Sequence, residues 1–100
     1  MKVALSASAE EDLVDGFEFY ARQQRGLEAY FLDRLFADID SLVLFAGVHP
    51  KPFSELHRTT GRRFPFSIDY RVAADVVTVV GVLDSRQNPA SIHAKLSGRT

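Results

Sequence analysis

The chain has 100 residues, no cysteine and a formal net charge of −1 at pH 7. This length predicts a single domain, 1–100, with one hydrophobic core, and the lack of cysteine excludes disulfide bonds and thiolate metal sites. No apolar stretch approaches the roughly 20 residues that span a bilayer, and residues 1–6 are too short for a secretory signal, so we expect a cytoplasmic protein.

The net charge hides a difference between the two halves of the chain. Residues 1–50 contain four Lys or Arg against nine Asp or Glu, which gives −5, whereas residues 51–100 contain eight against four, which gives +4. A split of this kind favours a local field that attracts an anionic partner, provided that the cations lie together in space.

Two helices are predicted after a short strand at residues 2–5. Ser6 or Ser8 can supply the N-cap of the first helix, and residues 8–11 (Ser-Ala-Glu-Glu) have the spacing of a capping box. Gly26 predicts the break, because glycine readily takes the left-handed conformation that ends helices. The second helix is expected from Leu27 to about Phe45, antiparallel to the first.

The apolar positions of the second helix cover about half of its circumference, which is wider than contact with a single neighbour requires. One interpretation is that this helix contacts both its partner helix and a sheet. The other is that part of the apolar arc receives another protein.

The second half of the chain predicts a sheet. Two prolines in the connector at residues 47–52 prevent a helix there, and residues 56–60 form a possible strand. Residues 64–72 alternate apolar and polar side chains, which predicts a strand with one buried face and one polar face. After a turn at 73–75, residues 76–83 are apolar on both faces, so this strand should be central.

This order of elements resembles the RelE/ParE toxins of bacterial type II toxin–antitoxin systems over nearly the whole chain. The features that carry the resemblance are Ala9-x-x-Asp12-Leu13, Gly26-Leu27, Phe64-Pro65-Phe66-x-Ile68-x-Tyr70-x-Val72 and Arg86-x-Asn88-Pro89. The resemblance implies an α+β fold with an N-terminal strand and an α-helical hairpin packed on one face of a mostly antiparallel sheet. The opposite face of the sheet would then be free to engage macromolecules.

The resemblance also implies a cognate antitoxin, of the ribbon-helix-helix type, whose C-terminal segment wraps the toxin. Phe19 lies on the acidic side of the first helix and Tyr30 lies off the main apolar arc of the second, and exposed aromatic side chains are favoured anchors at interfaces. Packing across the helical hairpin is the alternative role for both. The candidate antitoxin-binding residues are Phe19, Tyr30, Phe36, Val43 and Arg71.

Two activities occur in the family. ParE-like members bind DNA gyrase and trap its cleaved DNA complex, whereas RelE-like members cut messenger RNA on the ribosome. Gyrase binding needs no acid–base pair, and none of the three histidines (His49, His57 and His93) matches a catalytic motif. Asp84 stands where family members often carry histidine, and the C-terminal tyrosine or histidine of the nucleases is not clearly present.

We therefore expect a gyrase inhibitor that uses no cofactor and no metal. The alternatives are an endonuclease and a binding module of the same fold that has lost toxicity. The candidate target-binding residues are Arg62, Arg63, Arg86 and Lys95. The nuclease alternative would use Arg62, Arg63, Arg86 and His93, because the forked guanidinium suits phosphate.

Overall fold

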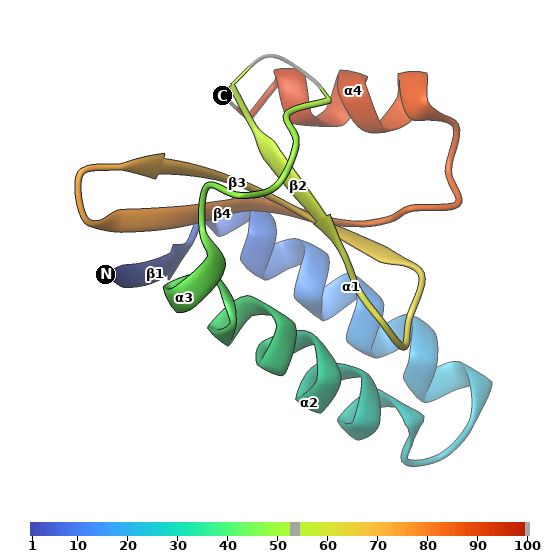
Figure 1. The fold of residues 1–100 in the computed structure, drawn as a ribbon. Coiled ribbons are helices and arrows are strands. Elements are labelled where there is room, and N and C mark those ends of the chain that lie inside the picture. The colour runs from blue at the N-terminus through green and yellow to red at the C-terminus, as the bar shows by residue number, and fades with distance from the viewer. Residues whose placement is uncertain (53–54, 100) are drawn as a thin grey trace.

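The computed structural model describes residues 1–52 and 55–99. In chain order it contains β1 (Lys2–Leu5), α1 (Ala7–Gln23), α2 (Leu27–Asp40), α3 (Leu42–Phe45), β2 (His57–Thr60), β3 (Phe66–Ala73), β4 (Val76–Asp84) and α4 (Pro89–Ser97). The strands form one four-stranded sheet in the order β1-β4-β3-β2 (Figure 1). β1 runs parallel to β4 and the other pairs are antiparallel, which confirms the predicted fold class. In the described ranges, no helix combines the length and apolar character needed to cross a membrane.

α1 begins directly at the end of β1. The Ser6 N–H donates to the Val79 carbonyl at 2.9 Å, and the Ser6 hydroxyl accepts a hydrogen bond from the Ala9 N–H at 3.1 Å. Ser6 is thus held by the sheet and caps the helix at once, which satisfies one of the free N–H groups of the first turn. The predicted capping box at Ser8 is wrong, because Ser8 already lies inside the helix.

The turn of the helical hairpin lies at Gly26, as the sequence predicted. Gly26 has a φ of +90°, in the left-handed region, and α2 starts at the next residue. The predicted single helix from Leu27 to Phe45 is interrupted at Ser41, whose hydroxyl donates to the Asp38 carbonyl at 2.6 Å. Such a local bond competes with continued helical pairing, and the chain resumes as the short helix α3.

The hairpin covers one face of the sheet, as Figure 1 shows. Its inward side chains include Leu13, Phe31 and Leu35, which join Ile68 and Tyr70 of the central strand β3 in one buried cluster. α2 therefore contacts both its partner helix and the sheet, as the width of its apolar arc indicated.

β4 contains a bulge that changes which face its side chains occupy. In the pairing with β3, Asp69 faces Gly81 and Tyr70 faces Val79, so Val80 is an extra residue. A strand normally alternates its faces every residue, and one inserted residue shifts that alternation by one. Consequently Val82 packs toward the helical hairpin together with Val79, whereas Val80 and Leu83 pack on the opposite face.

The opposite face of the sheet is covered by α4, so the expectation of a free face is wrong. Ile92 and Leu96 of α4 pack with Leu56 and Leu83 in a second buried cluster. α4 begins at Pro89, and the Asn88 side chain caps it by accepting a bond from the Ala90 N–H at 2.8 Å. Asn followed by Pro at the first helical position is a recognised start signal, and the sequence reading missed it.

The expected polar face of β3 is buried at Ser67 and Asp69, whereas Arg71 near the β3–β4 turn is exposed. Ser67 and Asp69 are 1% and 0% exposed. The Arg58 Nε donates to the Asp69 carboxylate at 2.8 Å, and the Ser67 hydroxyl donates to it at 3.4 Å. Burial raises the pKa of the Asp69 carboxyl, and the Arg58 hydrogen bond opposes that shift. The polar residue Asp69 thus forms a buried ion pair with Arg58 and does not face solvent.

Substitution of Gly16 by alanine tests the close approach of α1 and α2. A Cβ at Gly16 would lie 2.6 and 2.8 Å from two ring atoms of the buried Phe31. We expect Gly16→Ala to lower the free energy of unfolding, because overpacking of about 1–3 kcal/mol outweighs the ~1 kcal/mol gained from helix preference. Urea unfolding monitored by circular dichroism measures the change.

Gly98→Ala is the matched control. A Cβ there meets no atom closer than the Lys95 carbonyl oxygen at 3.7 Å, and Gly98 has a negative φ. Its midpoint should stay close to that of the parent chain, and equal midpoints for both variants would contradict the packing argument.

Candidate functional site

Aromatic side chains gather where α1, α2 and the beginning of β3 meet. The Phe64 ring centroid lies 4.8 Å from that of Tyr20, 5.4 Å from that of Phe31 and 5.5 Å from that of Tyr30. We call this region the aromatic end. Its members are Phe19, Tyr20, Tyr30, Phe31, Phe64 and Phe66.

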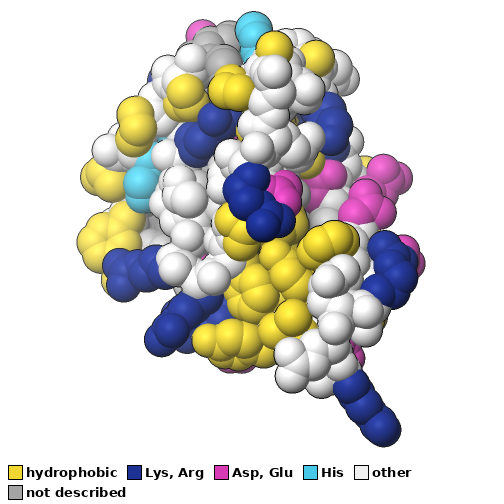
Figure 2. Space-filling model, turned by 90° about the vertical axis from the view of Figure 1, so that its right-hand side faces the viewer, with side chains coloured by type: hydrophobic (Ala, Val, Ile, Leu, Met, Phe, Trp, Pro, Cys, Tyr) yellow, Lys and Arg dark blue, Asp and Glu magenta, His cyan; other side chains and the backbone are white. Residues whose placement is uncertain are grey.

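The aromatic end combines a buried base with an exposed surface. Phe31, Tyr20 and Phe66 are at most 7% exposed, whereas Phe19 and Tyr30 are 41% and 45% exposed. Figure 2 looks onto this end of the molecule and shows a continuous apolar patch with charged side chains around its margin. Rigid aromatic surface beside charges is typical of macromolecular interfaces.

Arg86 follows β4 at the margin of this end and is clamped by Asp84. The Arg86 Nη2 lies 2.7 Å from Asp84 Oδ2, while its Nε and its backbone N–H donate to Oδ1 at 3.0 and 2.8 Å. The hydrogen bond from Arg86 holds the pKa of the Asp84 carboxyl below its usual range, and Asp84 in turn raises the pKa of Arg86. The forked face of this guanidinium is therefore occupied by a carboxylate of the same chain.

Tyr20 links the ion pair to the aromatic end. Burial raises the pKa of its hydroxyl, while Arg86 opposes that shift and Asp84 adds to it. A general base works best with a pKa near the operating pH. A phenol is already protonated at neutral pH, and the raised pKa moves Tyr20 farther from the range in which a side chain can act as a general base.

A cavity of about 420 Å³ opens beside the aromatic end, between α1, the end of β4 and α4. Its walls carry both apolar and charged side chains. They are Asp12, Asp15, Gly16, Phe19, Phe66, Val82, Leu83, Asp84, Gln87, Lys95 and Arg99. In the described part of the chain, no group of three or more His, Asp and Glu side chains is placed to hold a metal ion.

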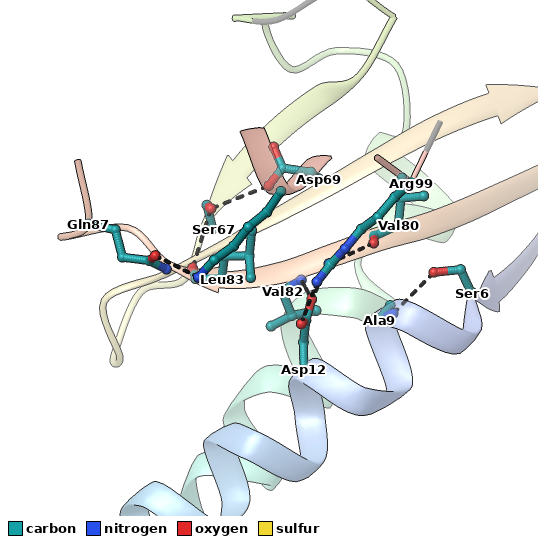
Figure 3. Close-up of polar contacts among 11 residues, drawn as sticks. Ser6, Ala9, Asp12, Ser67, Asp69, Val80, Val82, Leu83, Gln87 and Arg99 are labelled. Carbon is teal, nitrogen blue, oxygen red and sulfur yellow. Dashed lines mark hydrogen bonds and ion pairs between the residues drawn. The ribbon is translucent and has the colours of Figure 1, made fainter. Parts of the chain in front are cut away.

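The inner wall of the cavity is built by Asp12 and Arg99, 87 residues apart in sequence (Figure 3). The two guanidinium nitrogens of Arg99 donate to the two Asp12 carboxylate oxygens at 2.6 and 2.9 Å. Asp12 also accepts the Val82 N–H at 2.9 Å, and Arg99 donates to the Val80 carbonyl at 3.2 Å. The ion pair thus forms hydrogen bonds with backbone groups of β4 beyond Val79, where the pairing with β1 ends.

The structure brings only some of the candidate target-binding residues together. Lys95 lines the cavity and donates to the side-chain oxygen of Gln87 at 2.9 Å, and Gln87 directly follows Arg86 in the chain. Arg62 and Arg63 are exposed in the segment between β2 and β3, immediately before Phe64 of the aromatic end. His93 is exposed on α4 and not in an irregular tail.

The candidate antitoxin-binding residues are all exposed but do not form one group. Phe19 and Tyr30 belong to the aromatic end, whereas Phe36 on α2 and Val43 on α3 are 41% and 46% exposed farther along the hairpin. Arg71 lies toward the β3–β4 turn, at the opposite end of β3 from Phe66. Whether any of these residues binds a partner stays a prediction.

Three residues of this region were missed as site residues in the sequence. Tyr20 was read as one apolar position among others, and no sequence signal indicated the contact between Asp12 and Arg99. For Tyr20 the available signal was the hydroxyl on an otherwise apolar stripe, since a buried tyrosine hydroxyl usually has a polar neighbour. The ion pair between Arg86 and Asp84 joins residues that are only two positions apart in the sequence.

The arrangement of these elements is a ParE-like α+β fold. Its similarity to a solved chain described as part of the "Chromosomal ParDE TA system from P. aeruginosa" has a TM-score of 0.73 at 18% sequence identity, covering 82% of this chain and 92% of that chain. No protein-family model and no curated protein matches the sequence. The likeness therefore rests on three-dimensional structure, which confirms the fold expected from the sequence resemblance.

Asp12→Asn tests the ion pair that builds the cavity wall. The variant leaves the Arg99 guanidinium, which is 18% exposed, without its carboxylate partner. We expect the free energy of unfolding to fall by an amount near the lower end of the roughly 3–5 kcal/mol known for broken buried pairs. Urea unfolding gives the value, and hydrogen exchange of the Val82 amide reports the loss locally.

Asp15→Asn is the matched control, because Asp15 is exposed on the same helix and lines the same cavity. It should change stability by no more than about 0.5 kcal/mol. Equal effects of the two substitutions would show that the ion pair contributes nothing specific.

Proposed function

We propose that this chain is the toxin of a type II toxin–antitoxin system, that a cognate antitoxin neutralises it by direct binding, and that its target is DNA gyrase. It acts as one toxin domain over residues 1–100, in the cytoplasm, by stoichiometric binding and without a cofactor. The observation that carries the proposal is the fold match, which extends over 92% of a chain from a ParDE system.

Antitoxin binding is supported by the apolar surface of the helical hairpin. Phe19, Tyr30, Phe36 and Val43 each expose more than two fifths of their side chains. Scattered exposed apolar residues are ordinary, but aromatic side chains concentrated on one helical layer are typical anchors for a partner. We assign this surface to the C-terminal segment of a ribbon-helix-helix antitoxin. Arg71 is a separate candidate contact, because Ile68, Tyr70 and Val72 of β3 face the hairpin and Arg71 alternates to the other face of the sheet.

Gyrase binding is favoured over RNA cleavage by the state of Arg86 and Tyr20. The Arg86 fork is occupied by Asp84, so it would have to open before it could hold a scissile phosphate. Tyr20 has a raised pKa, which is unfavourable for a general base. A binding toxin needs neither group for proton transfer, and Arg62, Arg63, Arg86 and Lys95 then serve as contacts to the target.

Expression of the chain alone in a bacterial host separates the three possible activities. We expect filamentation and DNA-damage signalling, and the purified protein should block supercoiling by gyrase at a near-stoichiometric ratio. Intact supercoiling together with cleavage of ribosome-bound messenger RNA would replace the proposal with the nuclease alternative. Normal growth with folded protein would indicate a non-toxic binding module.

Arg86→Ala tests the assignment of the target-binding surface. The variant should still bind the cognate antitoxin, while the concentration needed for half-inhibition of gyrase rises roughly tenfold, as for an arginine anchor at an interface. Gyrase supercoiling assays and binding calorimetry measure the two effects.

Lys2→Ala is the control for loss of one positive charge. Lys2 is exposed on β1 and pairs with Val76, at the opposite end of β4 from Arg86. Its inhibition constant should match that of the parent chain. Unchanged inhibition by Arg86→Ala, with folded protein, would refute the role given to Arg86.

A further inference from the structure

A cluster of two histidines and a buried tyrosine lies away from the aromatic end. Tyr70 of β3 is 0% exposed, and its hydroxyl oxygen accepts the Gly47 N–H at 3.0 Å. His49 Nδ1 lies 2.5 Å from the same hydroxyl oxygen, and the two rings meet edge to face at 5.7 Å. The connector, residues 47–52, is thus fastened to the sheet through one phenol.

The hydrogen bonds define the tautomer of His49. The Tyr70 hydroxyl accepts from Gly47 and, because it is buried, its own proton needs an acceptor. His49 Nδ1 is placed to accept that proton, so in this arrangement it carries none, and the neutral ring is protonated at Nε2. A proton added to Nδ1 would turn the acceptor into a donor and leave the Tyr70 O–H facing another N–H.

His57 of β2 supports the same connection from the other side. Its Nδ1 lies 2.7 Å from the His49 carbonyl oxygen, so Nδ1 is the donor, and its ring stacks on Tyr70 at 5.1 Å and 18°. The Arg58 backbone N–H also donates to the Pro50 carbonyl at 2.9 Å. The histidine–tyrosine contact therefore lies at the centre of the attachment between the connector and β2.

We propose that His49 and Tyr70 form a pH-sensitive lock, in which the neutral His49 ring holds the connector against the sheet and its protonation releases residues 47–52. The connector is the element that is held or released. The switch is the change of His49 Nδ1 from a hydrogen-bond acceptor to a donor beside the buried Tyr70 hydroxyl.

The electrostatic surroundings of His49 agree with this direction. His57 faces it from β2 and Tyr70 faces it from β3, while Asp38 of α2 and Arg62 of the segment after β2 line the same cavity of about 290 Å³. Lys51 is the other charged residue of the connector. Burial lowers the pKa of His49, and His57 lowers it further.

The lowered pKa of His49 determines how the stability of the lock changes with pH. A histidine with a pKa below its ordinary 6.5 binds fewer protons in the locked state than in the released state. The lock therefore contributes its full stability above pH 6.5, and that contribution falls as the pH drops below 6.5 toward the lowered pKa. Release would also move Val48, which is 72% exposed and lines the cavity beside His49 together with Phe45 of α3.

Hydrogen exchange of the Gly47 amide, measured by NMR and expressed relative to an unstructured chain at the same pH, tests the lock. In the parent protein we expect protection to fall several-fold between pH 7.5 and pH 5, together with titration of the His49 ring. His49→Asn keeps an acceptor near the position of Nδ1 but cannot titrate, so its protection should not depend on pH. Tyr70→Phe removes the hydroxyl and should leave Gly47 unprotected at both values.

His93→Gln is the matched control, since it removes an exposed histidine on α4 and should behave as the parent protein does. The inference is overturned if parental protection stays constant while His49 titrates, or if His49→Asn loses protection at pH 5 as the parent does. Should Tyr70→Phe fail to fold, the comparison of the parent, His49→Asn and His93→Gln decides the matter alone.

Discussion

The contact between Asp12 and Arg99 is the interaction on which the arrangement of layers depends. The Asp12 carboxylate on α1 accepts hydrogen bonds from two guanidinium nitrogens of Arg99, which follows α4. It also accepts the backbone N–H of Val82 in β4. Because β1 pairs with β4 only as far as Val79, the later part of β4 would otherwise present unpaired backbone groups to an adjacent cavity. Asp12 accepts the Val82 N–H and Arg99 donates to the Val80 carbonyl, so two of those groups have partners. The same two side chains connect the helical layer, the sheet and the C-terminal region.

The glycine at position 81 makes this junction possible. A Cβ there would lie 2.7 Å from a methyl carbon of Leu96 and 3.2 Å from a guanidinium nitrogen of Arg99. The bare backbone at Gly81 thus admits both the apolar contact of α4 and the ion pair beside it. Glycine inside a strand often marks the close approach of another group, and Gly81 is such a position.

The sequence predicted those features that depend on local rules. Hydrophobic periodicity located both long helices and the last two strands, and the conformational freedom of Gly26 located the hairpin turn. What it did not predict arises from contacts between distant residues. Asp69 looked solvent-facing because alternation cannot distinguish water from a buried arginine, and the role of Asp12 depends on a partner 87 positions later.

The candidate site shows the same division. Exposure of Phe19 and Tyr30 followed from their angular position on the helices, which is a local property. The clamping of Arg86 by Asp84 was foreseeable because the two residues are neighbours, whereas the approach of Tyr20 to that pair requires the fold. α4 is the exception, since its start signal, Asn88-Pro89, was present in the sequence and was overlooked.

The extra residue at Val80 has a consequence for how this chain is compared with other proteins. Side chains before Val80 and after it follow opposite parities, so a residue-by-residue superposition that ignores the insertion would match outward positions to inward ones over the end of β4. An alignment of β4 with a strand that lacks the extra residue needs a one-residue gap at this point, whereas a strand with the same bulge aligns without one. Without that gap, buried positions on one face of β4 would be compared with positions on the other face in the segment that leads to Arg86.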